Sequence, residues 1–376
     1  MRVPFNRAYL TGREEGYVTA AMRGRLAGDG DFTRRCHAWL ETATGAHKAL
    51  LTHSCTAALE MAALLAELAP GDEVIMPSYT FVSTANAVVL RGATPVFVDV
   101  RADTLNLDET LIDAAITART RAIVPVHYGG VACEMDAIMA TAERHDLLVI
   151  EDDAQGLMAR YKGRALGSLG HLAAVSFHET KNLVAGEGGA LLVNAPRYAA
   201  RAEIIREKGT NRSAYFRGQV DKYSWVDVGS SFLPGEMNAA FLLAQLEEAE
   251  SITQRRRALW DAYHDAFAAL EAEGRVRRPG VPAHCEHNAH LYYLLLPDLA
   301  QRTRFIAHMR EAGIETPFHY VPLHAAPQGL KRGRAQGDLR HTVELADRLV
   351  RLPLWVGLEA DQPAVIDAAI RAITAG

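Results

Sequence analysis

The 376-residue chain is poor in cysteine, in lysine and in long apolar runs, and each shortage excludes something. Its four cysteines lie far apart with no C-x-x-C pair, so we expect neither a zinc framework nor a disulfide scaffold, and no metal site. No apolar run reaches the roughly 18–20 residues that span a bilayer, and Met1 to Leu10 lacks the segments of a signal peptide. A net charge of −5 argues against nucleic acid or an anionic membrane as the main partner. We therefore expect a cytoplasmic protein.

Lysine is scarce although basic residues are not. Of 40 lysine and arginine residues, only six are lysine: Lys48, Lys162, Lys181, Lys208, Lys222 and Lys331. A guanidinium group cannot supply a deprotonated amine, so any function that needs a nucleophilic amine has few candidates.

The middle of the chain alternates short apolar runs with helical stretches, which predicts an α/β architecture with right-handed crossovers. Several of the runs are continuously apolar, as expected of parallel strands buried on both faces. The predicted strands are 50–52, 73–76, 95–100, 122–126, 147–150, 173–177 and 190–193, and the predicted helices between them are 56–68, 111–118 and 135–145.

The pattern changes after about residue 235, where helices dominate. We expect helices within 239–270 and at 301–312, 342–350 and 361–373, with one strand at 290–296. This division predicts a large domain at residues 31–240 and a smaller α+β domain at 241–376. Residues 1–30 are expected to lie against the small domain or a partner.

Three segments carry polar groups that suit chemistry. The first, from His53 to Leu59, places hydroxyls at the start of a helix, where free N–H groups favour a phosphate, although simple N-capping is the ordinary interpretation of such residues. The second, from Glu151 to Gly156, places carboxylates after a strand, at the edge where α/β sheets bind ligands, and one of them could pair with a ring nitrogen of a cofactor. The acidic residues of this segment could instead bind Mg²⁺ or cap the start of a helix. The third places Lys181 in a loop after the strand that carries Ser176. A surface lysine is the ordinary interpretation there, but crowding would make this amine a nucleophile or base.

Together the three segments match what pyridoxal phosphate requires. The phosphate of this cofactor needs hydrogen-bond donors, its pyridinium needs an anion, and its aldehyde needs an amine.

Over almost its whole length the sequence resembles the DegT/DnrJ/EryC1/StrS sugar aminotransferases. It is most similar to the branch that makes dTDP-4-amino-4,6-dideoxygalactose for the enterobacterial common antigen, a cell-surface polysaccharide. The stretches that carry the resemblance are 28–30 with 32–36, 77–86, 124–128, 207–212 and 216–223. It implies the type I fold of aspartate aminotransferase, with a mostly parallel seven-stranded sheet in the large domain. It also implies a homodimer with shared active sites.

The resemblance also implies roles for individual residues. Lys181 would bond to the cofactor aldehyde, Asp152 would pair with the ring nitrogen, Gln155 would face the ring hydroxyl and Phe81 would stack on the ring. The phosphate would be held by Cys55, Thr56 and Ser176, and by Ser231 from the second subunit. Candidate contacts to the nucleotide sugar are Asn211, Arg212, Lys222, His319, Tyr320 and His324.

Some positions depart from the family's usual pattern. Cys55 stands where glycine is common, so its backbone N–H rather than its thiol would be the donor. Asp153 replaces a usual alanine and adds a negative charge beside Asp152. Ser231 replaces the commoner asparagine, and Leu233 stands where many relatives have arginine.

The resemblance implies amino transfer from L-glutamate to C4 of dTDP-4-keto-6-deoxy-D-glucose. The alternatives are a transaminase with an equatorial 4-amino or a 3-amino product, a dehydratase and a ligand-sensing homologue without activity. Dehydratases of this fold carry histidine in place of the lysine, so Lys181 argues against that alternative. Retention of Lys181, Asp152 and Gln155 together argues against the ligand-sensing one.

Overall fold

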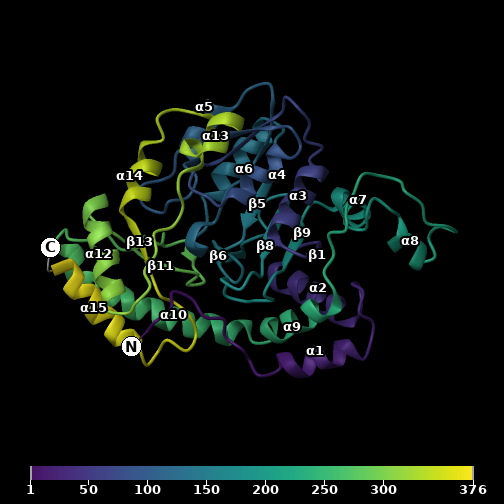
Figure 1. Cartoon of the computed structure of the whole chain (residues 1–376). Helices are drawn as coiled ribbons and strands as arrows, with labels where there is room; N and C mark the ends of the chain where they lie inside the picture. Colours follow the sequence, from purple (N-terminus) through teal and green to yellow (C-terminus); the bar gives the residue numbers. More distant parts are fainter. Residues whose placement is uncertain (1, 375–376) are drawn as a thin grey trace.

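The computed structural model describes residues 2–374, and a single large sheet forms its centre (Figure 1). In chain order its strands are β1 (Lys48–Thr52), β2 (Glu73–Pro77), β3 (Thr94–Val98), β4 (Thr120–Ile123), β5 (Leu148–Asp153), β8 (Leu172–Ser176), β9 (Gly189–Val193) and β12 (Arg334–Ala335). The spatial order is β1-β9-β8-β5-β4-β2-β3-β12. Strand β9 runs antiparallel to both of its neighbours, and every other pair is parallel.

All seven strands predicted from the sequence are present, but the sheet has eight strands rather than seven. The additional strand, β12, comes from the C-terminal part of the chain and pairs with β3 over only two residues. So short a segment has no apolar periodicity of its own, which is why the sequence did not reveal it.

Both faces of the sheet are buried, which explains the apolar runs. Within β1, Leu50 packs into one core cluster and Leu51 into another, because successive side chains point to opposite faces. One face is covered by α3 (Cys55–Leu65), α4 (Val82–Val89) and α7 (Ala199–Arg206). The other is covered by α2 (Asp31–Thr44), α5 (Ile112–Ala115), α6 (Met135–Arg144) and α9 (Glu236–Leu246).

A separate apolar cluster forms in the C-terminal part. Its helices are α10 (Ala249–Ala266), α11 (Ala268–Ala272), α12 (Leu299–Glu311) and α15 (Gln362–Thr374), and its strands are β11 (Tyr292–Leu295) and β13 (Leu349–Leu352), which pair antiparallel. Residue Val3 lies in this cluster and bridges Ile314, while α1 (Glu14–Met22) packs along α9. The domain boundaries at residues 30 and 240 stay a prediction.

The predicted helix 342–350 ends earlier than expected. Helix α14 (Arg340–Arg348) stops at Arg348, and the next four residues form β13. Pairing with β11 buries Leu349, Val350 and Leu352, and this burial outweighs continuation of the helix.

The remaining elements are short. A small three-stranded sheet joins β6 (Arg160–Tyr161), β7 (Arg164–Ala165) and β10 (Cys285–Glu286), and α13 (Pro327–Arg332) precedes β12. Within residues 2–374, no helix combines the length and apolar character needed to cross a membrane.

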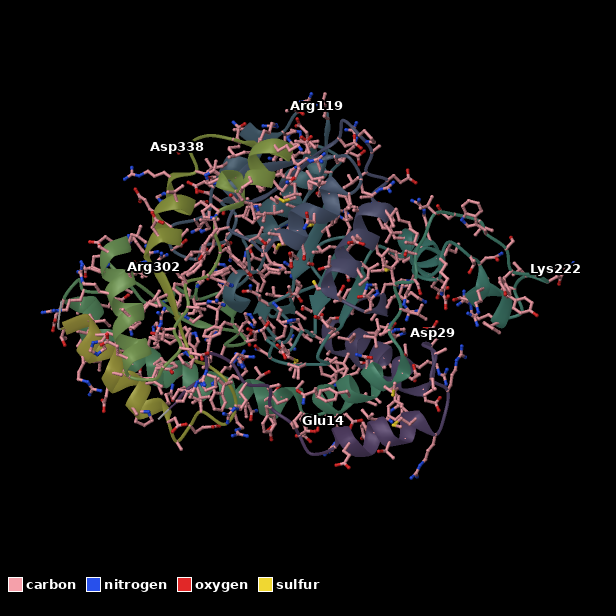
Figure 2. The ribbon with its side chains drawn as sticks, viewed as in Figure 1. Glu14, Asp29, Arg119, Lys222, Arg302 and Asp338 are labelled. Atoms are coloured by element: carbon pink, nitrogen blue, oxygen red, sulfur yellow. The ribbon has the colours of Figure 1, made fainter. Side chains whose placement is uncertain are left out.

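One segment projects from the body of the molecule. It comprises α8 (Arg212–Phe216) and the following loop to Val228, and we call residues 212–228 the arm (Figure 1). Lys222 lies at its outer end (Figure 2). The arm exposes large apolar side chains to solvent, including Phe216 at 65 % and Trp225 at 79 %. Such exposure is typical of a surface that contacts another protein.

Candidate active site

A cavity of about 660 Å³ lies at the edge of the large sheet where β5 and β8 end. In register at this edge, Thr52 of β1 faces Gly189 of β9, which faces Ser176 of β8. The cavity brings together nine residues that the sequence singled out: Cys55, Thr56, Phe81, Asp152, Gln155, Ser176, Lys181, His319 and Tyr320. They come from five separate segments of the chain.

Asp152 supplies a buried carboxylate near the end of β5. Its Oδ2 accepts a hydrogen bond from the Thr84 hydroxyl at 2.7 Å, and its Oδ1 accepts one from the Ala154 N–H at 3.2 Å. Burial raises the pKa of this carboxyl above its ordinary value, while the two hydrogen bonds and the Lys181 ammonium oppose that rise. The side chain is therefore held in one orientation, facing the cavity.

Lys181 supplies the amine. It lies in the loop after β8, where its N–H donates to the His178 carbonyl at 2.9 Å and the Glu179 N–H donates to the Gly186 carbonyl at 2.9 Å. Burial lowers the pKa of the Lys181 ammonium, and the Asp152 carboxylate opposes this shift. A lysine with a lowered pKa is easier to deprotonate and so becomes a better nucleophile and base.

The start of α3 supplies hydrogen-bond donors and hydroxyls. The Ser54 hydroxyl caps the helix by accepting from the Ala57 N–H at 3.1 Å, and the Thr56 hydroxyl bonds the Ser83 hydroxyl at 2.7 Å. A Cβ on Gly189 would approach the Cys55 backbone nitrogen to 2.4 Å, so only glycine lets β9 begin this close to the helix. Unpaired N–H groups at a helix start favour an anion.

A polar network of Gln155, His319 and Tyr320 also lines the cavity. The Gln155 side chain accepts from the Gly129 N–H at 2.7 Å and donates to the Tyr320 hydroxyl at 2.9 Å. His319 stacks on the Tyr320 ring with centroids 3.7 Å apart, and its Nδ1 lies 2.8 Å from the Tyr128 hydroxyl. Burial lowers the pKa of His319 well below its ordinary value, so this imidazole is neutral near pH 7.

These groups fit pyridoxal phosphate on the chemistry of their donors and acceptors. An amine, an oriented buried carboxylate and an anion-binding helix start line the same cavity, together with the half-exposed ring of Phe81. Cys55 fits as a backbone donor, because burial raises the pKa of its thiol well above the ordinary value and the thiol stays protonated.

Five predicted residues do not line the cavity within one chain. Ser231 is exposed near the base of the arm, and Asn211 stands at the start of α8 and accepts from the Ser224 N–H at 2.8 Å. Arg212 lies over the Phe216 ring at 5.2 Å, while Lys222 extends from the tip of the arm (Figure 2). The ring Nδ1 of His324 forms a hydrogen bond of 2.7 Å with the Ser78 hydroxyl.

The sequence did not single out three residues that contact this site. Thr84 was part of a matching stretch, but its bond to Asp152 spans 68 positions and leaves no local signal. His290 lines the cavity through the loop before β11. Arg351 lines it from β13, a strand that the sequence pattern had assigned to a helix and its end.

Comparison with known proteins identifies the fold and the type of reaction. The sequence profile of the DegT/DnrJ/EryC1/StrS aminotransferase family matches residues 9–371. The spore coat polysaccharide biosynthesis protein SpsC of Bacillus subtilis is 34 % identical over 98 % of this chain and 96 % of its own length.

Solved structures agree with this result. The putative sugar aminotransferase Spr1654 of Streptococcus pneumoniae, in its PLP form, superposes with a TM-score of 0.91 at 26 % identity, over 100 % of this chain and 99 % of its own. DesV of S. venezuelae, in complex with a ketimine intermediate, gives a TM-score of 0.87 at 32 % identity, over 96 % and 94 %. The predicted type I fold, transaminase activity and pyridoxal phosphate cofactor are confirmed. The chain therefore belongs to the DegT/DnrJ/EryC1/StrS aminotransferase family, and it is a sugar aminotransferase.

Proposed function

We propose that this enzyme moves the amino group of L-glutamate to C4 of dTDP-4-keto-6-deoxy-D-glucose, giving dTDP-4-amino-4,6-dideoxy-D-galactose. The choice of sugar rests on the resemblance of several long stretches to that branch of the family, among them 77–86, 207–212 and 216–223. A product of this kind would serve a cell-surface polysaccharide such as the enterobacterial common antigen.

The observation that carries the chemistry is the presence of Lys181, Asp152 and Gln155 in one cavity. Pyridoxal phosphate, when bound, supplies a ring that accepts electrons from the carbon that loses its proton. Asp152 keeps the ring nitrogen protonated, and Gln155 orients the ring through its hydroxyl.

Lys181 has two tasks in this proposal. It first holds the cofactor through its amine. Once the amino donor has displaced it, the same amine carries a proton away from Cα of the donor. In the second half of the reaction it delivers a proton to C4 of the sugar. The face from which that proton arrives decides whether the new amine is axial or equatorial.

We further propose that the enzyme is a homodimer with shared active sites. The arm holds Arg212 and Lys222, and Asn211 and Ser231 lie beside its two ends, outside the cavity of their own chain. Exposed Tyr223, at 54 %, lies on the same segment. A second copy whose cavity receives this segment would bury the apolar side chains and bring the polar ones to the nucleotide sugar.

Product analysis tests the sugar. The enzyme is incubated with dTDP-4-keto-6-deoxy-D-glucose, pyridoxal phosphate and L-glutamate, and the product is analysed by NMR. An axial amine at C4 leaves H4 equatorial, so small couplings to H3 and H5 are expected. Large trans-diaxial couplings would show the equatorial epimer and reject the galacto assignment. An amine on C3 would reject the C4 assignment.

A further inference from the structure

Arg351 is a cation without an anionic partner in the active-site cavity. Its side chain extends from β13 and lines the same cavity as Lys181. One guanidinium N–H donates to the Phe318 carbonyl at 2.9 Å, and the group lies over the Phe5 ring with 4.5 Å to the centroid. Its Nε is buried and has no acceptor among residues 2–374, where no carboxylate forms an ion pair with it. Of its five N–H donors, one therefore has a protein acceptor among these residues.

The other groups around the cavity do not neutralise this charge. Burial lowers the pKa values of His290 and His319 well below the ordinary value, with Arg351 as a further cause in both cases, so both rings are neutral near pH 7. Two carboxylates line the cavity. Asp152 accepts a hydrogen bond from Thr84, and Oε1 of Glu187 lies 3.7 Å from Nε2 of His178. A half-buried cation left without an anion costs free energy, and a bound anion would offset that cost.

We propose that Arg351 binds the α-carboxylate of the amino-acid donor, an inference that rests on the proposed aminotransferase function. A guanidinium matches a planar carboxylate with two parallel hydrogen bonds. Two sources of anion are available in this reaction, the carboxylate of the donor and the diphosphate of the nucleotide sugar.

Position favours the donor over the diphosphate. Arg351 lies close enough to Lys181 for its charge to lower the pKa of that ammonium. In the donor, the carboxylate is bonded directly to the carbon that carries the amine and gives up its proton to Lys181. In the nucleotide sugar, a hexose ring separates the diphosphate from the reacting ketone, which places the diphosphate further from Lys181.

The test separates the two half-reactions of the holoenzyme. L-Glutamate alone is mixed with wild type, Arg351→Gln and Arg351→Lys, and the loss of the cofactor's visible absorbance is followed by stopped flow. We expect Arg351→Gln to raise the glutamate concentration for half-maximal rate roughly 10- to 100-fold, the effect of losing hydrogen bonds to a charged group. Arg351→Lys should recover part of this affinity. The matched control Arg340→Gln, at an exposed ion pair with Glu344 outside the cavity, should behave like wild type.

A binding measurement without turnover accompanies the kinetics. Glutarate is a dicarboxylate that has no amine and cannot react, so calorimetry with it reports the carboxylate site alone. We expect wild type and Arg340→Gln to bind glutarate and Arg351→Gln to bind it at least tenfold more weakly, in all cases with unchanged circular dichroism. dTDP is titrated in parallel and should bind all three equally.

The opposite results overturn the inference. Equal glutarate and glutamate affinities in wild type and Arg351→Gln would show that Arg351 does not bind the donor. Weakened dTDP binding with unchanged glutarate binding would assign the residue to the diphosphate instead. If no amino acid changed the absorbance of wild type, the proposed function would fail, while the glutarate comparison would still decide whether Arg351 binds a carboxylate.

Discussion

Replacing Thr84 with valine should narrow the pH range in which the enzyme holds its cofactor. The Thr84 hydroxyl donates to Asp152 at 2.7 Å and itself receives a bond from the Thr80 hydroxyl at 2.9 Å, since the single Thr84 proton is used on the carboxylate. Valine keeps the shape of threonine but removes the donor. The ionised form of Asp152, which is the form proposed to pair with the ring nitrogen, then loses one of its two hydrogen bonds.

The direction and size of the effect follow from this contact. Burial already raises the pKa of Asp152, and the Thr84 hydrogen bond lowers it. Removing that bond therefore raises the pKa further. A hydrogen bond to a charged group contributes about 1.5–3 kcal/mol, which corresponds to roughly 1–2 pKa units. The ion pair with the cofactor is present above the pKa of Asp152 and is lost as pH falls through it. The pH at which cofactor binding weakens should therefore rise by about 1–2 units in Thr84→Val.

The measurement is a titration of the apoenzyme with pyridoxal phosphate at a series of pH values, with absorbance reporting the bound cofactor. Thr84→Ser is the matched control, because it keeps the hydroxyl and should follow wild type. If cofactor binding weakened at the same acidic pH in Thr84→Val, Thr84→Ser and wild type, the Thr84 hydroxyl would not control the ionisation of Asp152.

Three further predictions concern other parts of the molecule. Burial, with Glu151 and Asp152 nearby, raises the pKa of Asp153 well above its ordinary value, and neither carboxylate oxygen has a hydrogen-bond partner among residues 2–374. The unfolded chain ionises this group above about pH 4, so its contribution to stability falls as pH rises. Asp153→Asn should therefore unfold at a higher temperature than wild type at about pH 8 but not at about pH 4, and an equal difference at both pH values would contradict this. Cys55→Ala should keep cofactor affinity within about threefold in equilibrium dialysis, because a backbone N–H is the proposed donor; a loss of more than about tenfold would implicate the thiol. Trp225→Ser, in the arm, should weaken self-association at least about tenfold in analytical ultracentrifugation. The control Leu330→Ser changes a similarly exposed apolar side chain on α13 and should leave self-association unchanged. Equal effects of the two substitutions would reject the arm as the dimer contact.

The sequence predicts those strands and strand ends whose position depends on the local pattern of apolar and polar residues. Seven strands of the large sheet are mostly buried on both faces and each contains a short apolar run, which makes it visible in the sequence. Asp152 and Ser176 lie at the ends of neighbouring parallel strands, and such ends meet at one edge of a sheet. The same rule explains why the loop that carries Lys181 lies beside them.

Features that depend on tertiary contact were not predictable in this way. Strand β13 directly follows an amphipathic helix and is only four residues long, so periodicity alone could not separate the two, and Arg351 was hidden with it. Thr84 acts on Asp152 through a contact between distant segments. The residues in and beside the arm, such as Lys222, lie outside the cavity of their own chain, and no local pattern in the sequence predicts that position.

The covalent attachment of the cofactor tests the account most directly. The holoenzyme is treated with borohydride, which reduces the carbon–nitrogen double bond between a lysine and the cofactor, and its peptides are analysed by mass spectrometry. With only six lysines in the chain, the attachment site can be assigned without ambiguity. We predict that the cofactor mass is found on the peptide that contains Lys181 and is absent from Lys181→Ala. Attachment to any other lysine, or reduction that leaves no cofactor on the chain, would contradict the account.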